Sequence, residues 1–222
     1  MSRELPILFN VEMVRAILDG RKTCTRRICK DTNECTVPDM DFFDPEKRTY
    51  AVHNYADKEH TDKLSIAERT CPICPGDILY VRESYSELSF GYVYKADGEN
   101  IDHLGNVIKW HPSIHMPKEA ARIWLKVTDV RVERLQDMKP VDVIKEGAYP
   151  DCWDCLNTYG ESGSQCCYRT EEQCSQCDEV MMEWEKLWNS TIKKSDLDRY
   201  GWDASPWVWV IEFERCEKPE GV

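Results

Sequence analysis

A short basic turn near the N-terminus carries the side chains best suited to chemistry. Residues 20–27 read Gly-Arg-Lys-Thr-Cys-Thr-Arg-Arg, which places four cations and two threonine hydroxyls close together. Such a cluster offers a concentrated positive site, where guanidinium groups can bind a phosphate or steady an oxyanion. The alternative is a solvent-facing turn, since runs of charge usually face water. The cations of this segment, called the basic turn below, are Arg21, Lys22, Arg26 and Arg27.

The elements upstream of the basic turn determine where it begins. Ile7-Leu8-Phe9 is typical of a short buried strand, and Asn10 is placed to cap a helix over 11–19. Apolar residues at helical spacing support that helix. Asp19-Gly20 ends it, because glycine is the usual residue just past a helical end. The basic turn therefore leaves a helix directly and leads into a strand expected around 25–29.

The composition limits the partners. The chain has 222 residues, enough for a sizeable core, and its 29 basic and 41 acidic side chains give a net charge of −12. Duplex DNA is not expected as a partner, because its phosphates would be repelled by the net negative charge of the protein. Any contact with nucleic acid must therefore be local. No apolar run approaches the ~20 residues needed to cross a bilayer, and the N-terminal residues lack a signal-peptide apolar region. We therefore expect a soluble, cytoplasmic protein with no membrane partner.

Cysteine spacing predicts a structural zinc site. Twelve cysteines without a secretion signal favour metal binding over disulfides, because the cytosol keeps thiols reduced. Two C-x2-C pairs separated by eighteen residues match a four-thiolate zinc pattern. Cys166 and Cys167 lie between the pairs, and either could replace one ligand; the alternative is free thiols on a loop. The predicted zinc ligands are Cys152, Cys155, Cys174 and Cys177.

A second cysteine set gives a weaker metal pattern. Cys71 and Cys74 form one C-x2-C pair, and its partners would be Cys29 and Cys35, which are distant in sequence. The alternative is that these are ordinary thiols near the turn before the strand at 78–84. Other candidate ligands are His53 and His60.

The remaining patterns predict an α+β protein. A strand over 122–135 alternates until a one-residue slip at Thr128-Asp129, which indicates a bulge or bend. A helix over 139–147 has proline in its first turn and glycine at its end. Residues 31–70 lack clear periodicity and are expected to form an irregular insertion, apart from a hairpin near 49–53. Further strands are expected at 78–84, 91–95 and 207–213. An amphipathic helix over 179–192 should place Val180, Trp184, Leu187 and Trp188 on one face, with its tryptophans in the core.

Three segments together resemble the ASCH superfamily. They are the G-R-K-T-x-T-x-R motif of the basic turn, the G-D-x-L-x-V-R-E motif at 76–83 and the W-V-I-E-F strand at 209–213. The likeness is closest to ASCH-domain proteins encoded by phages and prophages. It implies a single domain over 1–222, a PUA-like (ASCH) mixed β-barrel with flanking helices. Two insertions, at about 31–70 and 150–177, would interrupt this barrel, the second of them stapled by zinc.

The resemblance also implies roles for individual residues. In ASCH amidohydrolases that release acetate from N4-acetylcytidine, the catalytic lysine, threonine and glutamate match Lys22, Thr25 and Glu146. A threonine hydroxyl needs an adjacent base, and the cationic neighbours of Lys22 disfavour its protonated form. Glu146 would pass a proton to the leaving amine. The ligand-binding residues would be Arg21, Arg26, Arg27, Arg82 and Glu83.

These observations leave three functions open. We favour binding of RNA or a modified nucleoside in a pocket lined by the basic turn, with a modified nucleoside or short single-stranded RNA as partner. The second is an amidohydrolase acting on N4-acylated cytidine through Lys22, Thr25 and Glu146. The third is a phage accessory or morphogenetic protein without catalysis, since a fold does not dictate a function.

Overall fold

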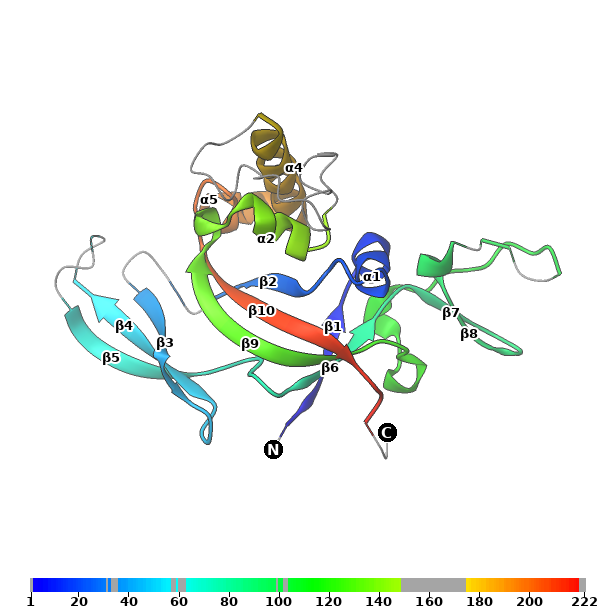
Figure 1. The fold of residues 1–222 in the computed structure, drawn as a ribbon, viewed down its shortest axis with the longest axis horizontal. Coiled ribbons are helices and arrows are strands. Elements are labelled where there is room, and N and C mark those ends of the chain that lie inside the picture. Colours follow the sequence, from blue (N-terminus) through cyan, green and yellow to red (C-terminus); the bar gives the residue numbers. More distant parts are fainter. Residues whose placement is uncertain are drawn as a thin grey trace, which may run out of the picture. The chain divides into compact units, whose positions relative to one another are not determined.

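The computed structural model shows an α+β chain that is mostly sheet (Figure 1). It describes residues 2–30, 32, 36–56, 59, 63–98, 100–101, 104–148 and 175–219. The strands are β1 (Glu4–Leu8), β2 (Cys24–Ile28), β3 (Thr36–Asp44), β4 (Thr49–Tyr55), β5 (Lys63–Thr70), β6 (Ile78–Arg82), β7 (Tyr85–Leu88), β8 (Gly91–Tyr94), β9 (Trp124–Arg134) and β10 (Trp207–Cys216). The helices are α1 (Val11–Leu18), α2 (Pro140–Lys145), α4 (Ser175–Thr191) and α5 (Leu197–Tyr200).

The described strands form open sheets. The largest has the order β1-β6-β9-β10-β2, with β1 parallel to β6 and β6 antiparallel to β9. The strands β3-β4-β5 make a second sheet, and β7-β8 form a hairpin. A barrel closes only when its two outer strands pair with each other. In the described residues β1 and β2 remain the outer strands of the large sheet, so the expected closed barrel is not observed.

The chain divides into two compact units, which we describe separately. Unit 1 comprises Met1–Thr23, Ile73–Asp129 and Glu212–Val222, and unit 2 comprises Cys24–Pro72 and Val130–Ile211. In unit 1, Met116, Ala120, Ala121 and Trp124 form a buried cluster. The tyrosines Tyr80, Tyr85, Tyr92 and Tyr94 pack around this cluster.

A buried aspartate explains the Gly-Asp pair of unit 1. Gly76 has a φ of +86°, a conformation that glycine adopts without steric cost. Asp77 is 0% exposed, and its carboxylate accepts the backbone N–H of Arg3 at 3.0 Å and of Cys74 at 2.9 Å. The Arg3 guanidinium adds an ion pair at 3.3 Å. Asp77 therefore ties the start of β1 to the turn that opens β6.

Helix α1 and its N-cap form as predicted. The Asn10 Oδ1 accepts the N–H of Met13 at 2.8 Å, which satisfies one of the free donors of the first turn. At the other end, Gly20 has a φ of +76°. The N–H groups of Arg21 and Lys22 both donate to the Ala16 carbonyl, at 2.9 and 3.0 Å. The end of the helix thus fixes the start of the basic turn.

Helix α4 supplies two tryptophans to the core of unit 2. Trp184 and Trp188 are 5% and 7% exposed, and they share a cluster with residues of α2 and β10. Val180 packs against this cluster, as predicted. Leu187, expected on the same face, is 38% exposed. Two tryptophans four residues apart define the buried stripe of the helix, and Leu187 lies at its margin.

The segment 36–70 is a three-stranded antiparallel sheet, so the expectation of an irregular insertion is wrong. Its central strand β4 buries Tyr50, whose ring lies edge-on to Trp209 at 4.8 Å between centroids. The turn between β3 and β4 is held by Asp44, whose Oδ1 accepts the N–H groups of Glu46 at 2.9 Å and Lys47 at 3.0 Å. Pairing and burial of β4 outweigh the low strand propensity of an Asp- and Pro-rich sequence.

The slip predicted in the long strand appears in the burial of β9. Val127 and Val130 are 1% and 5% exposed, whereas Thr128 and Asp129 between them are both exposed. Two exposed positions in succession break the alternation of the strand. The boundary between the two units falls at this same point of the chain.

Candidate functional site

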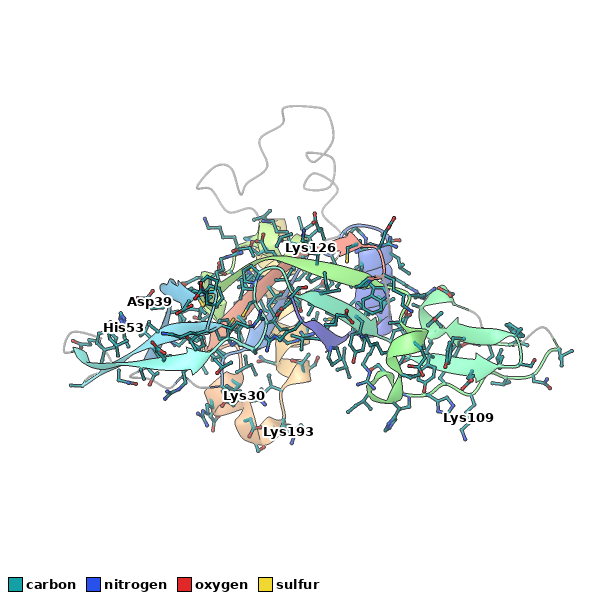
Figure 2. All side chains as sticks on the ribbon, turned by 90° about the horizontal axis from the view of Figure 1, so that it is seen from below. Lys30, Asp39, His53, Lys109, Lys126 and Lys193 are labelled. Atoms are coloured by element: carbon teal, nitrogen blue, oxygen red, sulfur yellow. The ribbon has the colours of Figure 1, made fainter. Side chains whose placement is uncertain are left out.

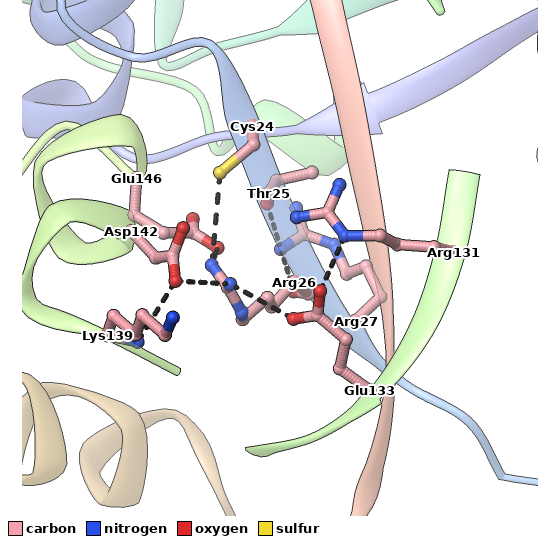
Figure 3. A network of polar contacts seen from close by, with 9 residues as sticks. All are labelled: Cys24, Thr25, Arg26, Arg27, Arg131, Glu133, Lys139, Asp142 and Glu146. Atoms are coloured by element: carbon pink, nitrogen blue, oxygen red, sulfur yellow. Dashed lines mark hydrogen bonds and ion pairs between the residues drawn. The ribbon is translucent and has the colours of Figure 1, made fainter. Parts of the chain in front are cut away.

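A buried arginine on β2 is the centre of the candidate site in unit 2 (Figure 3). Arg26 is 3% exposed, and its Nη1 lies 3.2 Å from Oε1 of Glu146. Its Nη2 lies 3.5 Å from Oε2 of Glu133 and 3.8 Å from Oδ2 of Asp142. A guanidinium does not lose its proton in proteins. Its burial therefore requires nearby carboxylates to offset the lost hydration.

Helix α2 presents two of these carboxylates. Its first turn is fixed by the N–H of Lys139, which donates to Oδ2 of Asp142 at 3.0 Å. Asp142 and Glu146 are four residues apart, so they project from the same face of the helix. Gly147 follows with a φ of +87° and ends the helix, as predicted. Both carboxylates are thereby directed toward Arg26 (Figure 3).

Glu133 extends the network to a second arginine. The Nε of Arg131 donates to Oε1 of Glu133 at 2.5 Å. These residues are two apart on β9, so their side chains leave the same face of the strand. Their side chains are 34% and 27% exposed, respectively. The network therefore runs from a buried guanidinium at Arg26 to a partly solvated one at Arg131.

Thr25 and Arg27 form a separate pair on β2. The Nη1 of Arg27 donates to Oγ1 of Thr25 at 3.0 Å and to the carbonyl of Arg26 at 3.1 Å. Alternate strand residues share a face, so this pair projects on the side of β2 opposite to Arg26. Burial lowers the pKa of Arg27, while the charge of Glu146 opposes that change. Because the Thr25 oxygen accepts here, its own proton remains available for donation.

The basic turn is not a solvated patch. Lys22 and Arg26 are each 3% exposed, so the solvent-facing interpretation is wrong for both. Lys22 belongs to unit 1, where its Nζ lies 5.3 Å from the ring centroid of Phe9. By contrast, the Arg21 side chain is 30% exposed and pairs with Asp19 at 3.0 Å.

The structure joins some of the predicted site residues and adds others. It pairs Arg26 with Glu146 and Thr25 with Arg27, whereas the catalytic set that also includes Lys22 stays a prediction. Three members of the network were not predicted from the sequence. Asp142 had a signal, because it stands four residues before Glu146 on the predicted helix. Glu133 and Arg131 alternate on the predicted long strand, which also indicated a shared face.

The predicted ligand residues Arg82 and Glu83 make internal contacts in unit 1. The Nε of Arg82 donates to the Met116 carbonyl at 2.7 Å. Glu83 is 1% exposed and accepts from Nε and Nη2 of Arg122 at 2.9 and 3.1 Å. Arg122 also pairs with Asp97 and stacks over the Tyr94 ring at 4.0 Å. Burial raises the pKa of Glu83, and Arg122 opposes that rise. Their ligand role stays a prediction.

Of the predicted zinc ligands, Cys152, Cys155 and Cys174 lie outside the described residues, and only the backbone of Cys177 is described. Of the second set, Cys29, Cys71 and Cys74 are buried, and Cys35 lies outside the described part. His53 lies 3.5 Å from Asp39 across β3 and β4 (Figure 2), whereas His60 is not described. Among the described residues no group of three or more His, Cys, Asp or Glu side chains could hold a metal ion. Zinc stays a prediction.

Comparison with known proteins does not indicate a function, so the function is inferred from the geometry of the site. No family model, curated protein or solved structure matches the chain. In the part of the chain that the structure describes, no helix is both long enough and apolar enough to span a membrane.

Removing Glu146 should strongly destabilise the fold. We expect Glu146→Ala to lower the free energy of unfolding by about 3–5 kcal/mol, because it leaves a buried guanidinium short of its nearest carboxylate. Glu133→Ala is the matched control and should cost less than about 1 kcal/mol, because its carboxylate is partly solvated. Urea denaturation measures both values.

A double variant separates the burial of charge from packing in this experiment. Arg26→Met combined with Glu146→Leu should recover most of the stability that Glu146→Ala loses, since apolar residues of similar volume can replace a buried ion pair. Equal costs for Glu146→Ala and Glu133→Ala would contradict a buried Arg26–Glu146 pair.

Arg122→Ala should destabilise the protein in a pH-dependent way. Without Arg122, the already raised pKa of Glu83 should rise further above its ordinary value of 4.5. A raised folded-state pKa favours the protonated carboxyl, so the stability of the variant is retained below about 4.5 and lost as pH rises through the folded pKa. The loss of unfolding free energy should therefore be larger at pH 8 than at pH 5, reaching about 3–5 kcal/mol.

Asp97→Ala is the control for this experiment, because it removes a partner of Arg122 whose side chain is 46% exposed. Its effect should be small and similar at both pH values. A cost of Arg122→Ala that does not change with pH would show that Glu83 is not held ionised by Arg122.

Proposed function

We propose that unit 2 binds a single modified nucleoside of the cytidine class next to the Arg26 network. The observation that carries this proposal is the burial of Arg26 against Glu146, at 3% exposure each. The resemblance of the basic turn to the ASCH motif supports the same ligand class. The groups that would contact the nucleoside are Glu146 and Arg26, which pair with each other on one face of β2.

The energetics of the Arg26–Glu146 pair favour a functional role. Burying two charges costs hydration that their attraction rarely exceeds, so apolar residues of the same size would often stabilise the fold equally well. Clusters of buried ionisable groups are therefore typical of functional sites. The Nε of Arg26 is buried as well, and it has no hydrogen-bond partner among the described residues.

The available donors and acceptors suit the edge of a base. The Glu146 carboxylate can accept from an exocyclic amine, and the Nε of Arg26 can donate to a ring or acyl oxygen. Single bases presented outside a helix are read in this way, by hydrogen bonds to their edges. The net charge of −12 opposes a long polyanion, which favours a nucleoside or a short single strand.

Thermal stability in the presence of nucleosides tests the proposal. N4-acetylcytidine or cytidine at one hundred times its dissociation constant should stabilise the protein by about 2.7 kcal/mol and raise its Tm. Glu146→Gln, which keeps the shape of the side chain but removes its charge, should lose this shift. Arg21→Ala should keep it, because that side chain lies at the surface.

Two outcomes would contradict nucleoside binding at this site. One is a panel of cytidine, uridine and N4-acetylcytidine that leaves the Tm unchanged. The other is a shift that Glu146→Gln retains in full. Duplex DNA that binds more tightly than any nucleoside at moderate salt would also argue against it.

A second candidate function is hydrolysis of the bound acyl group. The observation that favours it is the burial of Lys22 and Thr25, at 3% and 1% exposure, which withholds an amine and a hydroxyl from water. In this reaction the Thr25 oxygen would attack the acetyl carbonyl while Lys22 takes its proton, and Glu146 would pass that proton on to the departing cytidine amine. Water would then cleave the acyl-threonine, so that N4-acetylcytidine and water give cytidine and acetate.

Acetate release from N4-acetylcytidine tests the hydrolase. Lys22→Arg keeps the charge but removes a group able to act as base, so the rate should fall by about 10²–10⁴-fold. Thr25→Ala should lose activity, and Thr25→Ser should retain part of it. Arg21→Lys is the control and should have the wild-type rate. Absence of acetate with wild type would reject the hydrolase while leaving nucleoside binding intact, and a normal rate for Lys22→Arg would reject Lys22 as the base.

A further inference from the structure

A separate cavity in unit 2 has the size and lining of a small-molecule site. Its volume is about 410 Å³, within the range of roughly 300–1,000 Å³ found for ligand pockets. None of the residues of the Arg26 network lines it. Its walls come from the end of β9, helix α5, the start of β10 and Thr32. The polar and aromatic side chains in these walls are Thr32, Arg134, Asp198, Arg199, Tyr200 and Trp207.

Arg134 is held flat against one aromatic wall. Its guanidinium carbon lies 4.3 Å from the ring centroid of Trp207, and its Nη1 donates to the carbonyl of Ser205 at 3.1 Å. Partial burial lowers the pKa of Arg134. A guanidinium in this arrangement keeps a fork of donors in a fixed plane, with little entropy left to lose when it binds an anion.

A second arginine lies over a second aromatic ring. The Arg199 guanidinium carbon is 4.9 Å from the ring centroid of Tyr200. Asp198 precedes it and adds one carboxylate to the lining. The cavity therefore combines two guanidinium groups with a single acceptor that carries negative charge.

The backbone around the cavity is fixed by hydrogen bonds. Trp188 Nε1 donates to the Tyr200 carbonyl at 2.9 Å. The Trp207 carbonyl accepts from the N–H of Cys29 at 2.9 Å, and the Pro206 carbonyl accepts from the N–H of Leu135 at 3.0 Å. The Thr32 hydroxyl donates to the Cys29 carbonyl at 2.7 Å, which leaves its oxygen able to accept. The walls are thus preformed for a ligand.

We propose that this cavity binds a nucleoside monophosphate. The forks of Arg134 and Arg199 bind the phosphate, since planar guanidinium groups match its oxygen geometry. Asp198 would repel a second anionic group, but it accepts hydrogen bonds from ribose hydroxyls. Tyr200 and Trp207, together with the guanidinium planes stacked on them, provide flat surfaces for a base. The volume of about 410 Å³ is in the range of pockets that hold one small ligand.

Calorimetric titration of the full chain tests this assignment. The ligands are the four ribonucleoside 5′-monophosphates, the corresponding nucleosides and inorganic phosphate. At least one monophosphate should bind more tightly than its nucleoside and more tightly than phosphate. Arg199→Ala and Arg134→Lys should each weaken it by about tenfold or more, because each removes charge-assisted hydrogen bonds in a fixed geometry.

Lys193→Ala is the matched control for Arg199→Ala. It removes the same charge from an exposed side chain of the same segment, which does not line the cavity (Figure 2). Its affinity for the monophosphate should equal that of the wild type. Because the Arg199 side chain is exposed, its removal should leave the fold intact even if Arg134→Lys does not fold.

The cavity and the Arg26 site can be told apart in the same titration. Glu146→Gln should keep the affinity for the monophosphate, whatever it does to nucleoside binding. The proposal is overturned if no monophosphate binds at millimolar concentration, or if Arg199→Ala binds as tightly as wild type. Inorganic phosphate that binds as tightly as the monophosphate would also overturn it, by indicating a plain anion site.

Discussion

The burial of the Arg26 guanidinium is the constraint around which unit 2 is built. A charge that cannot be neutralised must be offset by carboxylates within a few ångströms. Glu133 from β9 and Asp142 and Glu146 from α2 supply them, at 3.2–3.8 Å. The strand β2, the strand β9 and the helix α2 are therefore linked by one set of charges. An apolar core could hold these elements together, but it would not prescribe which residue of each faces the others.

Unit 1 also buries charged groups that need compensating partners, but here the buried groups are carboxylates and not a cation. Asp77 is satisfied by two backbone N–H groups and by Arg3, and Glu83 is satisfied by a two-pronged contact with Arg122. Both residues belong to the G-D-x-L-x-V-R-E segment. The structure thus gives that segment a physical role that is independent of any ligand: Asp77 ties the start of β1 to the turn before β6, and Glu83 ties the end of β6 to Arg122.

The local elements were predictable from sequence, whereas the tertiary pairings were not. Asn10 and Gly20 predicted the ends of α1, and the break in apolar alternation at Thr128 and Asp129 predicted the slip in β9. Each of these signals acts within a few residues of the chain. The sheet of residues 36–70 was missed, because its strands are stabilised by mutual pairing more than by propensity. Burial of Lys22 and Arg26 was not predicted, since charge patterns usually indicate solvent. For Arg26, the carboxylates that permit burial lie over a hundred positions away.

Two neighbouring residues of β9 connect the Arg26 network with the cavity. Side chains alternate along a strand, so Glu133 and Arg134 must leave opposite faces of β9. Glu133 contacts Arg26 at 3.5 Å, and Arg134 stacks on Trp207 in the wall of the cavity. A register slip of one residue would move each side chain to the other face, putting the Arg134 guanidinium on the face of Arg26 and the Glu133 carboxylate on the face of the cavity. Like charges would then meet on one face, and an unpaired anion would meet the aromatic wall on the other. The register of β9 is therefore fixed by charge on both faces at once, and each of the two sites constrains the other through the backbone of a single strand.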